Sequence, residues 1–158
     1  MSAKSESDQP SVREHVLDAL ALIHLSAVVF VKRSDMPPEQ IAYELLRYWL
    51  DDVYSPGLRY MEGYKGDRSP TEVALFEESF TEEEFAWLER FNRFLELRID
   101  RLRPAEREEE QFPIKDTWNG IVRDAGNLIA LMEPDRYTGK ARLDRVRSEI
   151  NTRARLLP

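Results

Sequence analysis

The pattern of hydrophobic and polar positions singles out one stretch of the chain, residues 16–31 (VLDALALIHLSAVVFV). Thirteen of its sixteen residues are apolar, and only Asp18, His24 and Ser26 interrupt it. A helix at the surface of a globular protein carries polar residues on about half of its circumference. This stretch cannot do so, and it therefore predicts a helix that other segments of the chain surround.

This first helix is predicted to run from Ser11 to Arg33. Ser11 and Glu14 match the S-x-x-E capping box. The β-branched sequence VVFV at residues 28–31 also fits a strand, but its continuity with the preceding Leu/Ala run favours a helix. We expect most of six inward positions to be buried: Leu17, Leu20, Ile23, His24, Ala27 and Phe30.

Amphipathic stripes predict further helices, each bounded by proline, glycine or capping residues. The expected spans are residues 38–54, 70–80, 81–103, 114–132 and 140–157. Thr81 and Glu84 form a second capping box at the start of the longest helix. Gly120 and Gly126 weaken the helix at 114–132 by about 1 kcal/mol each relative to alanine, which indicates that a close neighbour needs the space.

The predicted fold is therefore an all-α, single-domain bundle of five or six helices around a central apolar N-terminal helix. The length of 158 residues fits one domain. Residues 1–10 are polar and are expected to form a disordered tail, which leaves residues 11–158 as the helical domain. Residues 55–70 form an unusually long connection, and such connections are often functional.

Several classes of protein are excluded by composition. The chain has no cysteine, which removes disulfides, thiolate nucleophiles and zinc–thiolate sites. Its N-terminus lacks the apolar core of a signal peptide. The apolar stretch is shorter than the about 20 residues of a membrane span and contains charge. These features predict a cytoplasmic protein with no membrane partner.

The charge is unevenly distributed along this acidic chain. Residues 1–135 hold 16 basic and 28 acidic side chains, whereas residues 136–158 hold seven basic and two acidic ones, so the net charge is −7. The acidic body argues against general nucleic-acid binding. The basic end favours an acidic partner, such as the acidic face of another subunit. We expect four arginines to lie outside the core stripe of the last helix and to serve this contact: Arg142, Arg145, Arg147 and Arg155.

Catalytic and metal-binding motifs are not evident. His15 and His24 are the only histidines, and neither belongs to a His-x3-His or Glu-x-x-His pattern. The runs of acidic residues are typical of solvated helix faces and caps. No nucleotide-binding glycine loop or nucleophile elbow is present. The sequence thus predicts no metal and no cofactor, and it favours a protein that is not an enzyme.

Two polar residues on apolar helix faces form a candidate pocket, His24 and Arg98. His24 faces inward, either as a neutral imidazole hydrogen-bonded to a neighbour or as a ligand-binding group in a cavity. Arg98 lies within an apolar arc, where its guanidinium must be paired, must reach solvent, or must bind an anion in a pocket.

A cluster of aromatic and basic residues forms a candidate interaction surface. Five of the six tyrosines lie between positions 43 and 64, and Tyr, Trp and Arg are enriched at binding hot spots. The candidate residues are Trp49, Tyr54, Arg59, Tyr60, Tyr64 and Arg68. The alternative is that these rings cover the core with their hydroxyl groups in water.

The sequence is compatible with three functions. The first is a non-enzymatic protein-interaction module, most simply a homodimer that uses the aromatic–basic segment or the last helix. The second is a small-ligand-binding protein or enzyme with a pocket at His24 and Arg98. The third, less favoured, is a nucleic-acid-associated protein that uses the basic C-terminal helix.

Overall fold

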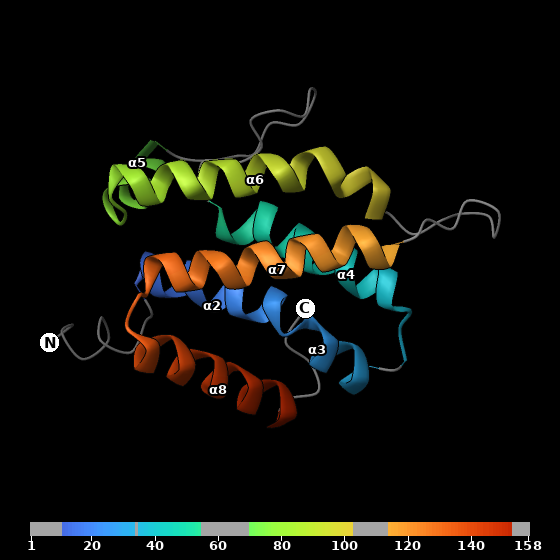
Figure 1. Cartoon of the computed structure of the whole chain (residues 1–158). Helices are drawn as coiled ribbons and strands as arrows, with labels where there is room; N and C mark the ends of the chain where they lie inside the picture. The colour runs from blue at the N-terminus through green and yellow to red at the C-terminus, as the bar shows by residue number, and fades with distance from the viewer. Residues whose placement is uncertain (1–10, 34, 55–69, 103–113, 153–158) are drawn as a thin grey trace, which may run out of the picture.

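The computed structural model describes residues 11–33, 35–54, 70–102 and 114–152 (Figure 1). Over these ranges the regular elements are all helical and no strand occurs, which confirms the all-α class. The elements are α2 (Val12–His24), α3 (Ser26–Lys32), α4 (Pro38–Tyr48), the π-helical turn η1 (Trp49–Val53), α5 (Pro70–Glu78), α6 (Glu82–Leu102), α7 (Ile114–Met132) and α8 (Arg136–Thr152). These are seven α-helices, so the expected count of five or six is not confirmed.

The predicted first helix is in fact two helices. α2 and α3 are bent by 65° at Leu25, which corrects the expectation of one helix from Ser11 to Arg33. The backbone N–H of Leu25 still bonds to the carbonyl of Ala21, but its ψ of 19° leaves the helical range. Because of this bend α3 packs against α4 and α8, whereas α2 packs against α7 and α8.

The buried core includes much of α2. Leu17, Leu20 and Ile23 are all buried, as expected. His24 and Phe30 are only half-buried and Ala27 is exposed, so the inward stripe does not continue unchanged through the bend. Of the two glycines of α7, Gly126 lies against this region, because a Cβ there would lie 2.5 Å from Cε1 of His24. The nearest atom to a Cβ at Gly120 would be Cζ of Phe94 on α6, at 3.9 Å, so the expected close neighbour is found at Gly126 and not at Gly120.

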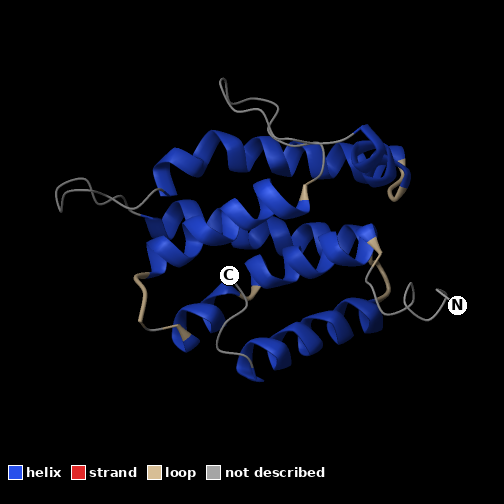
Figure 2. Cartoon of the chain, turned by 180° about the vertical axis from the view of Figure 1, so that it is seen from behind, coloured by secondary structure: helices blue, strands red, loops and turns tan. Residues whose placement is uncertain are grey.

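The other helices lie on both sides of the contact between α2 and α7. In Figure 1, α5 and α6 lie on one side of the molecule, α8 lies on the opposite side, and α2, α4 and α7 lie between them. Figure 2 shows the same order from behind. α6 packs against α7 and α4, and α8 packs against α2, α3 and α7. α6 and α8 therefore lie on opposite sides of α2, α4 and α7 (Figure 1).

Three helix ends differ from the predicted spans by two residues or more. The helix predicted over 70–80 ends at Glu78. The helix predicted over 38–54 ends in the π-helical turn η1, where the N–H of Tyr54 bonds to the carbonyl oxygen of Trp49 at 2.8 Å. α8 begins at Arg136 rather than residue 140, because Asp135 caps it by accepting a bond from the N–H of Tyr137 at 2.9 Å. The predicted helix at 114–132 agrees with α7.

Candidate functional site

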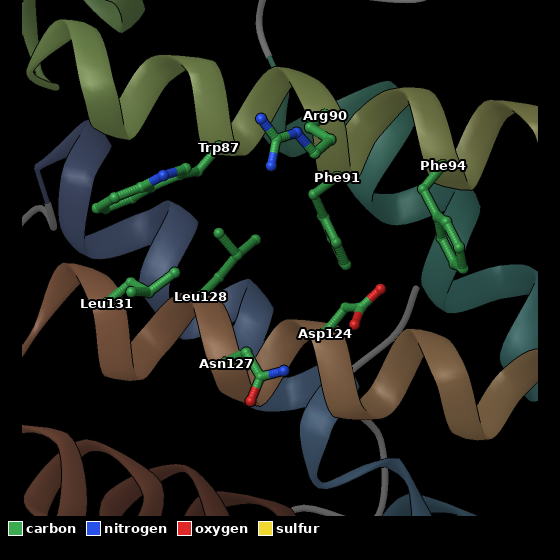
Figure 3. Close-up of a pocket in the computed structure, with 8 residues that line it drawn as sticks. All are labelled: Trp87, Arg90, Phe91, Phe94, Asp124, Asn127, Leu128 and Leu131. Carbon is green, nitrogen blue, oxygen red and sulfur yellow. The ribbon is translucent and has the colours of Figure 1, made fainter.

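An open pocket of about 250 Å³ lies between α6 and α7 (Figure 3), and we call it the α6/α7 pocket. Both helices contribute residues spaced three, four and seven positions apart, the spacing that places side chains on one helix face. The lining residues are Trp87, Arg90, Phe91 and Phe94 from α6 and Asp124, Asn127, Leu128 and Leu131 from α7.

The α6/α7 pocket combines an apolar interior with a charged margin. Phe91 and Leu128 are buried, whereas Leu131 is 52% exposed. In Figure 3 the side chain of Arg90 comes from α6 and that of Asp124 from α7, so the two sides of the pocket carry opposite charge. Trp87 and Leu131 lie together at one end of it. Such a surface offers shape and apolar contact rather than a reacting group.

A second pocket, of about 180 Å³, lies where α2, α4 and α8 meet, and we call it the α2/α4/α8 pocket. It is lined by His15, Asp18, Ala19, Leu22, Tyr48, Val146 and Glu149. The rings of His15 and Tyr48 meet edge to face, with centroids 6.1 Å apart. Burial, and then the charges of Asp52 and Asp18, raise the pKa of Tyr48 above its usual value.

A charge network borders the second pocket and joins α2 to α8. The guanidinium of Arg142, only 6% exposed, donates to Asp18 at 2.5 Å, to Glu14 at 2.7 Å and to Glu133 at 2.7 Å. The hydrogen bonds to these carboxylates, that to Glu133 first, raise the pKa of Arg142. Arg145 donates to the same Asp18 oxygen at 2.6 Å.

These contacts correct the expectation that Arg142 and Arg145 face an acidic partner. The acidic face that they need belongs to their own chain, on α2 and at the start of the α7–α8 connection. Arg147 is exposed as expected, and Arg155 lies outside the described residues.

The aromatic–basic surface predicted around residue 50 is also corrected in part. Trp49 and Tyr54 are both 0% exposed, so they belong to the core. Trp49 stacks on Tyr54, meets Phe91 edge to face at 5.3 Å, and donates its indole N–H to Asn92 at 3.0 Å. The π-helical turn directs both rings inward. The other four candidates, Arg59, Tyr60, Tyr64 and Arg68, lie outside the described residues.

His24 and Arg98, the residues of the predicted pocket, line neither the α6/α7 pocket nor the α2/α4/α8 pocket. His24 is half-buried and donates Nδ1–H to the carbonyl of Val122 at 2.9 Å. Arg98 lies with its guanidinium carbon 3.6 Å from the ring centroid of Phe94 and donates to the carbonyl oxygen of the same residue. Arg98 is therefore half-buried because its guanidinium stacks on the ring of Phe94, and neither pocket contains it.

Within the described ranges, no group of three or more His, Asp or Glu side chains is placed to hold a metal ion. No single described helix is long and apolar enough to cross a membrane; α2 and α3 meet that criterion only when taken together, across their 65° bend.

Known proteins offer no guide to function. No protein-family model matches the chain, and neither the curated proteins nor the solved structures contain a match.

The sequence reasoning missed the α6/α7 pocket, although a signal for it was present. The longest predicted helix carries Trp87 and Phe94 beside its main apolar stripe, and α7 carries Leu131 beside its own. Each helix thus has more apolar surface than one contact can cover. Only the pairing of the two helices reveals that these extra residues share one cavity.

Proposed function

We propose that this protein is a non-enzymatic protein-interaction module, a helical bundle organised around α2, that self-associates through the α6/α7 pocket. The observation that carries this proposal is the open apolar pocket with the half-exposed Leu131 at its edge. Contiguous exposed apolar surface with a polar border is characteristic of protein interaction sites. Burial of this surface by a partner would be favourable by roughly 25 cal/mol per Å² of apolar area.

The lining of the α6/α7 pocket favours a protein side chain as its occupant. Its volume of about 250 Å³ lies below the about 300–1,000 Å³ typical of sites for drug-sized ligands, and it suffices for one apolar side chain. Its lining also contains a single carboxylate and no histidine, so it lacks the pair of groups in contrasting environments that acid–base catalysis requires.

A second copy of the chain is the occupant that the charges favour. A two-fold interface uses the same patch on both subunits, so the patch must be complementary to itself. The α6/α7 pocket fits this condition because it has a cavity, the half-exposed Leu131, and the opposite charges of Arg90 and Asp124 on its two sides. In such a dimer Arg90 would face Asp124 of the partner subunit.

Sedimentation equilibrium of the full chain at micromolar concentrations tests this proposal. We expect a dimer for the natural sequence and a monomer for Leu131→Glu, because the interface would bury an unpaired carboxylate. Leu97→Glu is the matched control, since Leu97 is a leucine of α6 that is 61% exposed and lies outside the pocket. A natural protein that is monomeric throughout, or equal dissociation of both variants, would refute the proposal.

Charge reversal tests the two-fold pairing itself. Arg90→Asp and Asp124→Arg should each weaken the dimer, because like charges would then face each other. The double variant should restore much of the affinity, since the opposite charges are exchanged but kept. Failure of the double variant to recover would exclude the Arg90–Asp124 pairing.

A further inference from the structure

The α2/α4/α8 pocket is distinct from the α6/α7 pocket, and its chemistry is different. One face of α2 forms its base, with the buried Ala19 and Leu22 as an apolar floor. Tyr48 of α4 adds an aromatic ring to the lining, and Glu149 of α8 adds a carboxylate. The pocket therefore offers apolar, aromatic and carboxylate surface within one small volume.

Carboxylates outnumber cations in the network around this pocket. Four carboxylates, those of Glu14, Asp18, Glu133 and Glu149, share two guanidiniums, those of Arg142 and Arg145. Both guanidiniums donate to the same oxygen of Asp18, Oδ1. The network therefore has two more negative than positive charges. Asp18 and Glu149, which line the pocket, carry part of this excess.

The charges of Asp52 and Asp18 also act on Tyr48. Its pKa is raised by burial first, and then by the charges of Asp52 and Asp18. Burial disfavours a charge of either sign, whereas the two carboxylates favour a cation at this place. An aromatic wall adds to this preference, because the face of a tyrosine ring attracts ammonium groups.

We propose that the α2/α4/α8 pocket binds a small organic cation, an alkylammonium group, with its alkyl part on Ala19 and Leu22 and its charge toward Asp18 and Glu149. The apolar floor disfavours a hydrated metal ion, and the excess negative charge disfavours an anion. The alkylammonium can belong to a free amine or to a lysine side chain of a peptide. This proposal does not depend on self-association through the α6/α7 pocket.

Amide chemical-shift titration of the ¹⁵N-labelled full chain tests the site directly. Butylamine should produce saturable shifts centred on His15, Tyr48 and Val146, whereas the neutral analogue 1-butanol should not. Nα-acetyl-lysine methylamide distinguishes the two sources: binding tighter than that of butylamine identifies a peptide lysine, and equal or weaker binding identifies a free amine. Absence of saturable shifts with both amines, or equal shifts with butanol, would overturn the proposal.

Matched variants locate the binding. Tyr48→Leu should weaken butylamine binding about 2- to 30-fold, as expected for loss of a cation–π contact. Glu149→Gln should also weaken it, and because Glu149 is exposed this substitution should leave the fold intact. Asp144→Asn, an exposed residue of the same helix outside the pocket, removes the same charge and should leave binding unchanged. If Asp144→Asn weakens binding as much as Glu149→Gln does, overall charge explains the effect and the site is refuted.

Discussion

Replacement of Gly126 by alanine is expected to destabilise the protein, against the normal preference of helices for alanine. Gly126 lies on α7 where this helix packs against α2. A methyl group there would lie 2.5 Å from Cε1 and 2.6 Å from Nδ1 of His24. The ring is held in place because Nδ1–H donates to the carbonyl of Val122 at 2.9 Å. Either the ring or the helix must therefore move.

Three effects set the expected change in the free energy of unfolding of Gly126→Ala, two of them destabilising and one stabilising. Overpacking of a well-packed contact costs about 1–3 kcal/mol, and loss of the His24 hydrogen bond costs about 0.5–1.5 kcal/mol. The gain in helix propensity from glycine to alanine offsets about 1 kcal/mol. We therefore expect Gly126→Ala to lower the free energy of unfolding by about 0.5–3.5 kcal/mol.

Gly120 on the same helix provides the matched control. The nearest atom to a methyl group at position 120 is Cζ of Phe94 at 3.9 Å, which is an ordinary contact distance. Gly120→Ala should therefore keep the propensity gain and raise the free energy of unfolding by up to about 1 kcal/mol. The two substitutions are chemically identical, so their opposite signs isolate the effect of His24.

Urea unfolding followed by far-UV circular dichroism measures both changes, provided that the m-value is unchanged. In a protein of this size, 1 kcal/mol corresponds to about 2–4 °C in Tm. The double variant His24→Ala/Gly126→Ala should lose less stability than the sum of the single variants, because the ring that clashes is absent. If Gly126→Ala stabilises the protein as much as Gly120→Ala does, the packing of His24 on Gly126 is wrong.

Three further outcomes are expected from the core and the charge network. Ile23→Ala, at a position 2% exposed, should lower the free energy of unfolding by about 2–5 kcal/mol in chemical denaturation; a loss below about 1 kcal/mol would contradict a core role for α2. Arg142→Met should lower the free energy of unfolding by about 3 kcal/mol in the same assay, because it leaves buried carboxylate without its cation. Arg145→Met, at an exposed position, should lower it by at most about 1 kcal/mol. The pKa of Glu84 is lowered mainly by its hydrogen bonds from Arg13. The stability that the ionised Glu84 contributes is therefore present above its unfolded-state pKa and is lost as the pH falls through its lower folded-state pKa. In unfolding free energies measured over a pH series, Glu84→Gln should make this loss at acid pH smaller.

The helices themselves were largely predictable, because their signals are local. The predicted span 114–132 agrees with α7, and the predicted capping box at the start of α6 forms in both directions. The Glu84 N–H bonds to the Thr81 hydroxyl at 3.1 Å, and the Thr81 N–H bonds to Glu84 at 3.0 Å. Apolar periodicity and capping depend on residues within about one or two turns of each other. The sequence alone therefore determined the all-α class and most helix boundaries.

The orientation of single side chains depended on partners far away in the chain. Trp49 lies at the end of an apolar stripe whether it covers the core or faces a partner, and only its bond to Asn92 and its contact with Phe91 make it a core residue. Sequence pattern could not choose between these two possibilities, because the residues that decide them are on another helix.

The candidate sites were decided by tertiary structure for the same reason. Arg142 is outside the apolar stripe of α8, which predicted a solvent-exposed cation, yet carboxylates of α2 and of the α7–α8 connection surround it. Each pocket likewise combines side chains from separate helices. Helix formation is governed by neighbours in sequence, so it can be predicted from one chain. Pockets and ion pairs are governed by neighbours in space, and only the packing of α2, α6, α7 and α8 brought them together.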